Sequence, residues 1–166
     1  MGQLNKFDIF LQIAKKLNEK NIIPLLMGSV GLEEITMKDW DSKDLDIHVP
    51  GDKRGWEVPA EVAIDNWEDI MDLMERLGFE LIDLHEHEFV KNHVSVEFGI
   101  IDTLPEFAGI MLKDLQMHTV EGAHYFLLTA EQYLKVYQAS TQDSYRLEQN
   151  NSKDFEKINY LKSICN

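Results

Sequence analysis

The sequence is poor in cysteine and has no long apolar run, and each shortage excludes a class of protein. Its single cysteine, Cys165, rules out an intrachain disulfide framework. No apolar run approaches the ~20 residues that a membrane-spanning helix needs. The first 20 residues have an amphipathic pattern instead of that of a signal peptide. We therefore expect a cytoplasmic protein with no membrane partner.

Basic residues are also scarce, because 16 Lys and Arg stand against 30 Asp and Glu and leave a net charge of −14. Proteins that bind long nucleic acids carry a basic stripe, and none is visible here, so long nucleic acid is not an expected partner. An acidic surface suits small cationic substrates or a basic protein, and it also maintains solubility. The sequence leaves the oligomeric state open.

The chain of 166 residues, 44% of them hydrophobic, is long enough for one compact domain over 1–166. We interpret residues 51–62 as an ordered loop, and we expect an irregular or short helical link through Glu33 and Thr36 after the strand over 22–28. A capping box of Thr129 and Gln132 opens a C-terminal helix. Apolar spacing predicts helices over about 7–17, 67–77, 130–139 and from Ser152 onward, and strands over 22–28, 44–49, 79–90, 93–101, 116–120 and 124–128.

Two short polar motifs follow or begin apolar strands. Asp44 and Asp46 are two residues apart on an alternating strand, so both side chains leave the same face of a sheet. Two such carboxylates repel unless a cation lies between them, and Mg²⁺ takes oxygen ligands of this kind. Gly28 and Ser29 end a buried strand in a turn whose N–H groups and hydroxyl suit phosphate oxygens. Either motif alone also arises by chance in so acidic a chain.

A third carboxylate would support a metal site, because phosphoryl transfer commonly uses a cluster of acids that holds two cations. Glu97 lies between Val96 and Phe98 on a strand that we expect to be central, where it needs solvent, a partner or a metal. Asp102 is the competitor, but it follows the strand and precedes Leu104-Pro105, where an Asp often makes a turn. We therefore favour Glu97.

His85-Glu86-His87-Glu88 is the most conspicuous remaining stretch. On a strand, the two histidines share one face, and with His93 or His48 they would form a zinc site. A surface ribbon with cross-strand charge pairs is the alternative. A third interpretation is that these side chains line an acceptor pocket one strand away from Glu97.

Trp40 and Trp56 lie in expected loops on either side of the acidic strand. Loop aromatics of this kind stack on a base or an acceptor ring, or they only anchor their loop. We therefore count both tryptophans, together with the histidines at 48, 85 and 87, as candidates for a substrate pocket.

Together, Gly28-Ser29, Asp44-x-Asp46 and an acid on a later strand resemble the DNA polymerase beta-like nucleotidyltransferase superfamily. The chain looks most like its small bacterial branch, which includes antibiotic nucleotidyltransferases of the lincosamide and aminoglycoside type. The likeness covers about residues 20–164. The C-terminal motifs that contribute to it are Tyr145-Arg146, Lys153-Asp154 and Lys157-Ile158-x-x-Leu161.

This resemblance implies an α/β (α+β) fold, with a mixed sheet flanked by helices in a core over 20–128 and a helical segment over 129–166. It also implies two Mg²⁺ ions as cofactors, a nucleoside triphosphate as substrate and transfer of its monophosphate to a small-molecule or protein hydroxyl. The implied metal ligands and catalytic residues are Asp44, Asp46 and Glu97, and the implied nucleotide-binding residues are Gly28, Ser29, Arg146 and Lys153.

Two alternatives stay open beside this enzyme. One is a catalytically inactive module with the same fold that serves binding or regulation, for example in a toxin–antitoxin pair. The other is a zinc-binding protein that uses His85 and His87.

Overall fold

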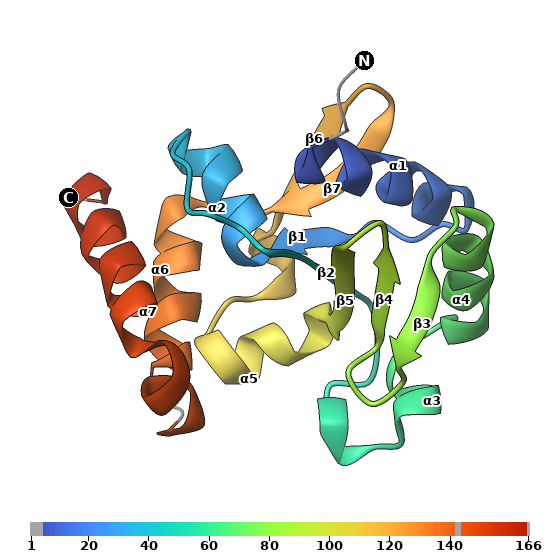
Figure 1. Cartoon of the computed structure of the whole chain (residues 1–166). Helices are drawn as coiled ribbons and strands as arrows, with labels where there is room; N and C mark the ends of the chain where they lie inside the picture. Colours follow the sequence, from blue (N-terminus) through green and yellow to red (C-terminus); the bar gives the residue numbers. More distant parts are fainter. Residues whose placement is uncertain (1–4, 142–143, 166) are drawn as a thin grey trace.

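A computed structural model describes residues 5–141 and 144–165, with the side chains of 144–153 left outside the description. Within these ranges seven strands form one mixed sheet in the order β3-β4-β5-β2-β1-β7-β6 (Figure 1). The α+β fold class expected from the sequence is confirmed. The strands are β1 (Leu25–Met27), β2 (Asp44–Val49), β3 (Glu80–Asp83), β4 (Glu88–Lys91), β5 (Val94–Ile100), β6 (Gln116–Val120) and β7 (Ala123–Leu127).

Helices cover both faces of the sheet. Short 3₁₀ turns, η1 (Gly55–Glu57), η2 (Ile101–Thr103) and η3 (Leu112–Asp114), join some of these elements. The helices are α1 (Lys6–Glu19), α2 (Gly28–Thr36), α3 (Ala60–Ala63), α4 (Trp67–Arg76), α5 (Leu104–Ala108), α6 (Ala130–Ser140) and α7 (Ser144–Ile164).

The two central strands divide apolar from polar side chains. On β2, Leu45 and Ile47 are fully buried, while the intervening Asp46 and His48 are only half-buried. The apolar face packs against α1 and α4, where the Trp67 ring of α4 contacts Phe98 of β5. Because alternate residues of a strand point to opposite faces, this core leaves the acidic side chains on the other face of the sheet.

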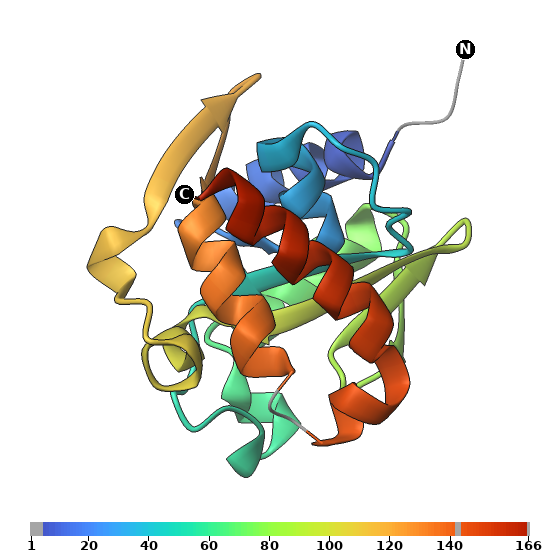
Figure 2. The ribbon, with the colours of Figure 1, turned by 90° about the vertical axis from the view of Figure 1, so that its left-hand side faces the viewer.

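Helices α6 and α7 run side by side in front of the sheet (Figure 2). The predicted capping box is present at the start of α6, where Thr129 and Gln132 exchange hydrogen bonds. Further along this helix, the buried Tyr133 hydroxyl donates a 2.7 Å hydrogen bond to the carbonyl oxygen of Leu26 on β1. A Cβ atom at Gly31 would lie 2.0 Å from that hydroxyl, so the glycine makes room for it. The helix pair is thereby fixed beside the end of β1.

One strand prediction was wrong, because residues 79–90 do not form a single strand. The chain reverses between β3 and β4, with His87 N–H donating to the carbonyl oxygen of Leu84 and Glu86 N–H donating to the carboxylate of Asp83. His87 has a left-handed backbone (φ 52°), which a strand does not permit. The next turn lies at Asn92 and His93, both at positive φ, one residue later than expected.

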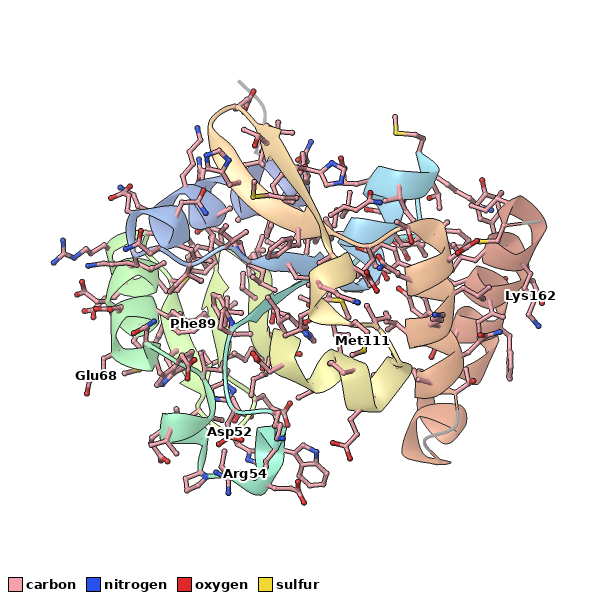
Figure 3. All side chains as sticks on the ribbon, turned by 180° about the vertical axis from the view of Figure 1, so that it is seen from behind. Asp52, Arg54, Glu68, Phe89, Met111 and Lys162 are labelled. Atoms are coloured by element: carbon pink, nitrogen blue, oxygen red, sulfur yellow. The ribbon has the colours of Figure 1, made fainter. Side chains whose placement is uncertain are left out.

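Other boundaries also moved. The link expected to be irregular or a short helix is a nine-residue helix, α2, and the last helix begins at Ser144 instead of Ser152. The 51–62 loop contains η1 and the start of α3, and in it the Arg54 guanidinium lies 2.7 Å from the Asp52 carboxylate (Figure 3). Hydrogen bonds from Arg54 lower the pKa of Asp52 to about 2. None of the described helices has both the length and the apolar character that a membrane span requires.

Candidate active site

The acidic side chains of the two central strands meet because β2 and β5 pair in parallel. Asp46 lies opposite Glu97, and Asp44 lies opposite Ser95. Directly paired residues in a sheet project from the same face, so the Asp44, Asp46 and Glu97 side chains share the polar face. The expected grouping of these three acids on one face is therefore present in the fold.

Gly28 lies next to this group, because its neighbour Met27 pairs with Asp46 across β1 and β2. A Cβ atom at Gly28 would approach the Cβ atom of Asp46 to 3.1 Å, and Gly28 has a positive φ of 68°. Both constraints favour glycine over any L-residue with a side chain. The Gly28-Ser29 step thus brings the beginning of α2 beside Asp46.

Ser29 is linked to the far end of the sequence. The Lys157 ammonium of α7 donates a 2.8 Å hydrogen bond to the Ser29 hydroxyl. Lys157 is only 9% exposed, and its ammonium lies 5.2 Å from the centre of the Tyr137 ring. A positive charge is therefore held at the N-terminal end of α2, where backbone N–H groups also favour anions.

Two cavities adjoin this point. A cavity of about 270 Å³, which we call the acidic cavity, lies between β2, β5 and α7. A second one of about 250 Å³, the aromatic cavity, lies towards α5 and α6. Ser29, Asp46 and Lys157 line both of them. The remaining lining of the acidic cavity is Trp40, Asp41, Lys43, Asp44, Leu45, Glu97 and Asp154.

Glu97 is the most perturbed carboxyl group of the site. Its burial, together with the negative charges of Asp46, Glu88 and other nearby acids, raises its pKa to about 7. The pKa of Asp44 is raised as well, first by burial and then by Glu88, while Lys6 opposes this. Glu88 pairs with Glu97 across β4 and β5, so it belongs to the same acidic group. A carboxyl group that titrates near neutrality is suited to accept a proton.

His48 contacts the carboxylate of Asp46, with its Nε2 atom 3.2 Å from Oδ1. The imidazole occupies the space beside Gly99, where an added Cβ atom would lie 2.4 Å from Nε2. The other ring nitrogen, Nδ1, is buried and has no hydrogen-bond partner among the described residues. His48 thus holds Asp46 on one side and turns a polar atom away from it.

The donor set fits a hard divalent cation by its chemistry. Asp44, Asp46 and Glu97 supply carboxylate oxygens from adjacent strands, and their mutual repulsion is of the kind that a cation relieves. In the described part of the chain, no group of three His, Cys, Asp or Glu side chains is arranged to hold a metal ion by itself. Mg²⁺ typically binds one or two carboxylates and completes its shell with water and substrate phosphates.

The five candidate pocket residues do not form one pocket. Trp40 lines the acidic cavity and His48 the aromatic one, whereas Trp56, His85 and His87 line a third cavity of about 210 Å³. The expectation that His85 and His87 share a strand face was wrong, since both lie in the turn after β3.

The third cavity gives no sign of a zinc site. The His87 Nε2 atom is 2.8 Å from the Ala60 carbonyl oxygen, and its side chain is buried against Trp67. The His85 side chain is 73% exposed. One imidazole is thus bonded to the backbone and the other is largely in solvent, and within residues 5–141 and 144–165 no group of three His, Cys, Asp or Glu side chains is arranged to hold a metal ion.

Among the basic candidates, Arg146 and Lys153 are on α7, but their side chains lie outside the described residues. Lys157, one turn after Lys153, is bonded to Ser29 and lines both cavities, and Lys43 also lines the acidic one. The signal for it was its spacing on the last helix, next to the apolar stripe. Asp102, the rival of Glu97, instead accepts a 2.9 Å hydrogen bond from the Gly51 N–H.

Comparison with known proteins finds one relative by sequence and two solved structures with a similar fold. No protein-family model matches the chain. The chain is 38% identical over 159 residues to the uncharacterized protein YnaI of Bacillus subtilis (strain 168). The matched region covers 95% of this chain and 96% of that protein.

Two solved structures have the same fold. An antigenic nucleotidyltransferase-like protein from Paracoccidioides brasiliensis superposes with a TM-score of 0.61 at 17% identity, over 95% of this chain and 75% of that one. The antibiotic-resistance factor ANT(2'')-Ia superposes with a TM-score of 0.63 at 13% identity, over 98% and 86% of the two chains. The fold is therefore that of nucleotidyltransferases, as the sequence motifs had indicated.

Proposed function

We propose that this chain, which belongs to the same family as Bacillus subtilis YnaI, is a metal-dependent nucleotidyltransferase. It would transfer a nucleoside monophosphate from a nucleoside triphosphate to a hydroxyl group of a small molecule or a protein. The observation that carries the proposal is the direct pairing of Asp46 with Glu97 beside a serine that is bonded to a buried lysine. The shared fold of the solved nucleotidyltransferases supports it.

The triphosphate would bind where Ser29 meets Lys157. The Ser29 hydroxyl and the first N–H groups of α2 are donors for phosphate oxygens, and the Lys157 ammonium supplies a charge. Burial of Lys157 strengthens this attraction, because the surrounding dielectric is lower than that of water. The β- and γ-phosphates are assigned to this end of the site.

Asp44, Asp46 and Glu97 would hold Mg²⁺. When bound, the cation withdraws charge from the α-phosphate and from the departing pyrophosphate. His48, whose Nε2 atom lies 3.2 Å from Oδ1 of Asp46, would keep that carboxylate in place. These residues require a bound nucleotide to complete the metal site, as is usual for Mg²⁺.

The transfer itself makes one bond and breaks one. The acceptor oxygen forms a bond to the α-phosphorus, and the bond from that phosphorus to the bridging α–β oxygen breaks, so that pyrophosphate leaves with the electron pair. The hydroxyl proton passes to the Glu97 carboxylate, which lies on the same sheet face as Asp44 and Asp46 and lines the acidic cavity. Lys157 neutralises charge on the leaving pyrophosphate.

Calorimetry with non-hydrolysable analogues of the four nucleoside triphosphates tests the proposal. We expect at least one analogue to bind the wild type in the presence of Mg²⁺ and to lose affinity at least tenfold in Asp46→Asn. Asp52→Asn is a matched control, because Asp52 lies in the 51–62 loop and lines neither cavity of the site. Absence of binding by all four analogues, with or without Mg²⁺, would defeat the proposal.

Turnover separates an enzyme from an inactive module of the same fold. With a bound triphosphate that is labelled in its α-phosphate, slow transfer to water should release labelled monophosphate, and Glu97→Gln should abolish that release at a nucleotide concentration that saturates the variant. Binding without any release, in wild type and variant alike, would favour the regulatory alternative.

A further inference from the structure

The two cavities of the site meet along one line of residues. Ser29, Asp46 and Lys157 belong to the walls of both the acidic and the aromatic cavity. If the proposed function holds, the phosphates of the nucleotide lie along this line. The two cavities are similar in volume, about 270 and 250 Å³, so their size does not decide which of them takes the nucleoside part of a nucleotide.

The walls of the cavities differ in charge. Apart from the shared Asp46, the acidic cavity is lined by the four acids Asp41, Asp44, Glu97 and Asp154 and by one further base, Lys43. Among the residues that line the aromatic cavity, Asp46 is the one carboxylate. A nucleobase is uncharged and flat, so it gains by leaving water for apolar and aromatic walls, not for a group of acids.

Aromatic and aliphatic side chains form most of the second cavity. Tyr137 and Val136 come from α6, and Phe107 comes from α5. Tyr137 and Val136 are buried, whereas the Phe107 ring is 49% exposed, although large apolar side chains are usually covered. A base that stacked on Phe107 would cover this ring.

The aromatic cavity also has polar groups that can form hydrogen bonds with a nucleoside. His48 lines it, and its buried Nδ1 atom has no hydrogen-bond partner among the described residues. A buried polar atom in this condition costs free energy unless a ligand or water satisfies it. Ser140, at the last turn of α6, adds a hydroxyl that can donate or accept. Ribose hydroxyls and the edges of a base are suitable partners for both.

We infer that the aromatic cavity binds the nucleoside part of the triphosphate, with its base against Phe107 and Tyr137, and that the acidic cavity is left for the acceptor. This inference rests on the proposed function, because it takes the triphosphate as the ligand at Ser29 and Lys157. It assigns the uncharged half of one substrate to the cavity with fewer acidic residues and leaves the cavity that Glu97 lines for the acceptor.

A comparison of two ligands separates the base from the phosphates. The probes are a non-hydrolysable nucleoside triphosphate analogue and inorganic tripolyphosphate, each titrated calorimetrically with Mg²⁺. Ser140→Phe narrows the aromatic cavity, and Phe107→Ala removes an exposed ring with little risk to folding. Phe155→Ala is the matched control, since Phe155 is 44% exposed on α7 and lines neither cavity.

We expect Phe107→Ala to weaken binding of the triphosphate analogue by at least about fivefold, which is the lower end of what base–aromatic stacking contributes. Ser140→Phe should reduce its affinity towards that of tripolyphosphate. Tripolyphosphate itself should bind both variants, and Phe155→Ala should bind both ligands, as the wild type does.

Four results would contradict this assignment in different ways. Wild-type affinity for the analogue in both cavity variants overturns the inference, and so does an equal loss for analogue and tripolyphosphate in folded Phe107→Ala. If Trp40→Ala lost affinity for the analogue while both aromatic-cavity variants kept it, the base would belong to the acidic cavity. If neither ligand binds the wild type, the proposed function fails, and the inference fails with it.

Discussion

The Nζ atom of Lys157 lies 2.8 Å from the Oγ atom of Ser29, 128 residues earlier in the chain. This bond joins the last helix to the first turn of α2, directly beside the paired Asp46 and Glu97. A buried ammonium thus faces a group of carboxylates across a cavity of about 270 Å³. The acidic cavity can therefore hold an anion and a cation together. A few contacts within and around the site support it, and each can be tested by substitution.

Replacing Lys157 by Met should weaken binding of tripolyphosphate and of triphosphate analogues about 10- to 100-fold, because a hydrogen bond to a charged group contributes ~1.5–3 kcal/mol. Calorimetry with Mg²⁺ present measures the change. Lys162→Met is the control, since Lys162 is an exposed lysine on the outer side of the same helix (Figure 3). Equal losses in the two variants would show that only the net charge matters.

Glu97→Gln should make the metal-free protein more stable at pH 8 than the wild type, by on the order of 1 kcal/mol. The pKa of Glu97 is raised from 4.5 to about 7 in the folded state. The folded state therefore holds the proton more tightly, and the stability that this gives is full below pH 4.5 and is lost as the pH rises to about 7. The magnitude is discounted because the side chain is partly solvated.

Urea unfolding in the presence of a chelator, at pH 4 and at pH 8, measures this difference. At pH 4 the two proteins should be nearly equal in stability. Glu75→Gln, an exposed position on α4, is a control for the loss of a surface charge. A Glu97→Gln protein that is equally or less stable at pH 8 would contradict the raised pKa.

Gly31→Ala should destabilise the protein by about 1–3 kcal/mol, the usual cost of overpacking. In most helices this change is stabilising by up to about 1 kcal/mol. Here the new Cβ atom would lie 2.0 Å from the Tyr133 hydroxyl and 2.8 Å from the Leu26 carbonyl oxygen. Thermal unfolding of the single variants and of the Gly31→Ala/Tyr133→Phe double variant provides the measurement. The double variant should lose less stability than the sum of the two single changes, and strict additivity would argue against the contact.

Gly99→Ala should weaken Mg²⁺-dependent binding of a triphosphate analogue about tenfold, the lower end of the effect of residues that orient metal ligands. The added Cβ atom would lie 2.4 Å from Nε2 of His48, so the imidazole has to leave the Asp46 carboxylate. Calorimetry at several Mg²⁺ concentrations detects the shift.

Gly122→Ala controls for a general loss of stability, because Gly122 is at φ 85° in the β6–β7 turn and a Cβ atom there would meet no neighbour within 4 Å. We expect this control to unfold earlier and to keep the wild-type dependence on Mg²⁺. A Gly99→Ala protein with that same dependence would remove His48 from its positioning role.

Much of the fold follows from local patterns. The alternation in Leu45-Asp46-Ile47-His48 specified both the strand and its polar face, since side chains in a strand alternate. The capping box at Thr129 likewise followed from two residues three apart. The strand predicted over 79–90 was wrong, because polar residues such as His85 and Glu86 fit a strand edge and a turn equally well, and a left-handed residue decided for the turn.

The sequence by itself determined the set of chemical groups, because their types and spacing are local properties. These groups are two aspartates on one strand, a glycine-serine step and a later glutamate. What only the tertiary structure decided is which of the scattered groups meet. Lys157 rather than another lysine bonds Ser29, Trp40 is separated from Trp56, and one carboxyl group has a pKa near 7. These outcomes depend on strand register, helix packing and burial, which arise from contacts between residues far apart in the chain and leave no local signal.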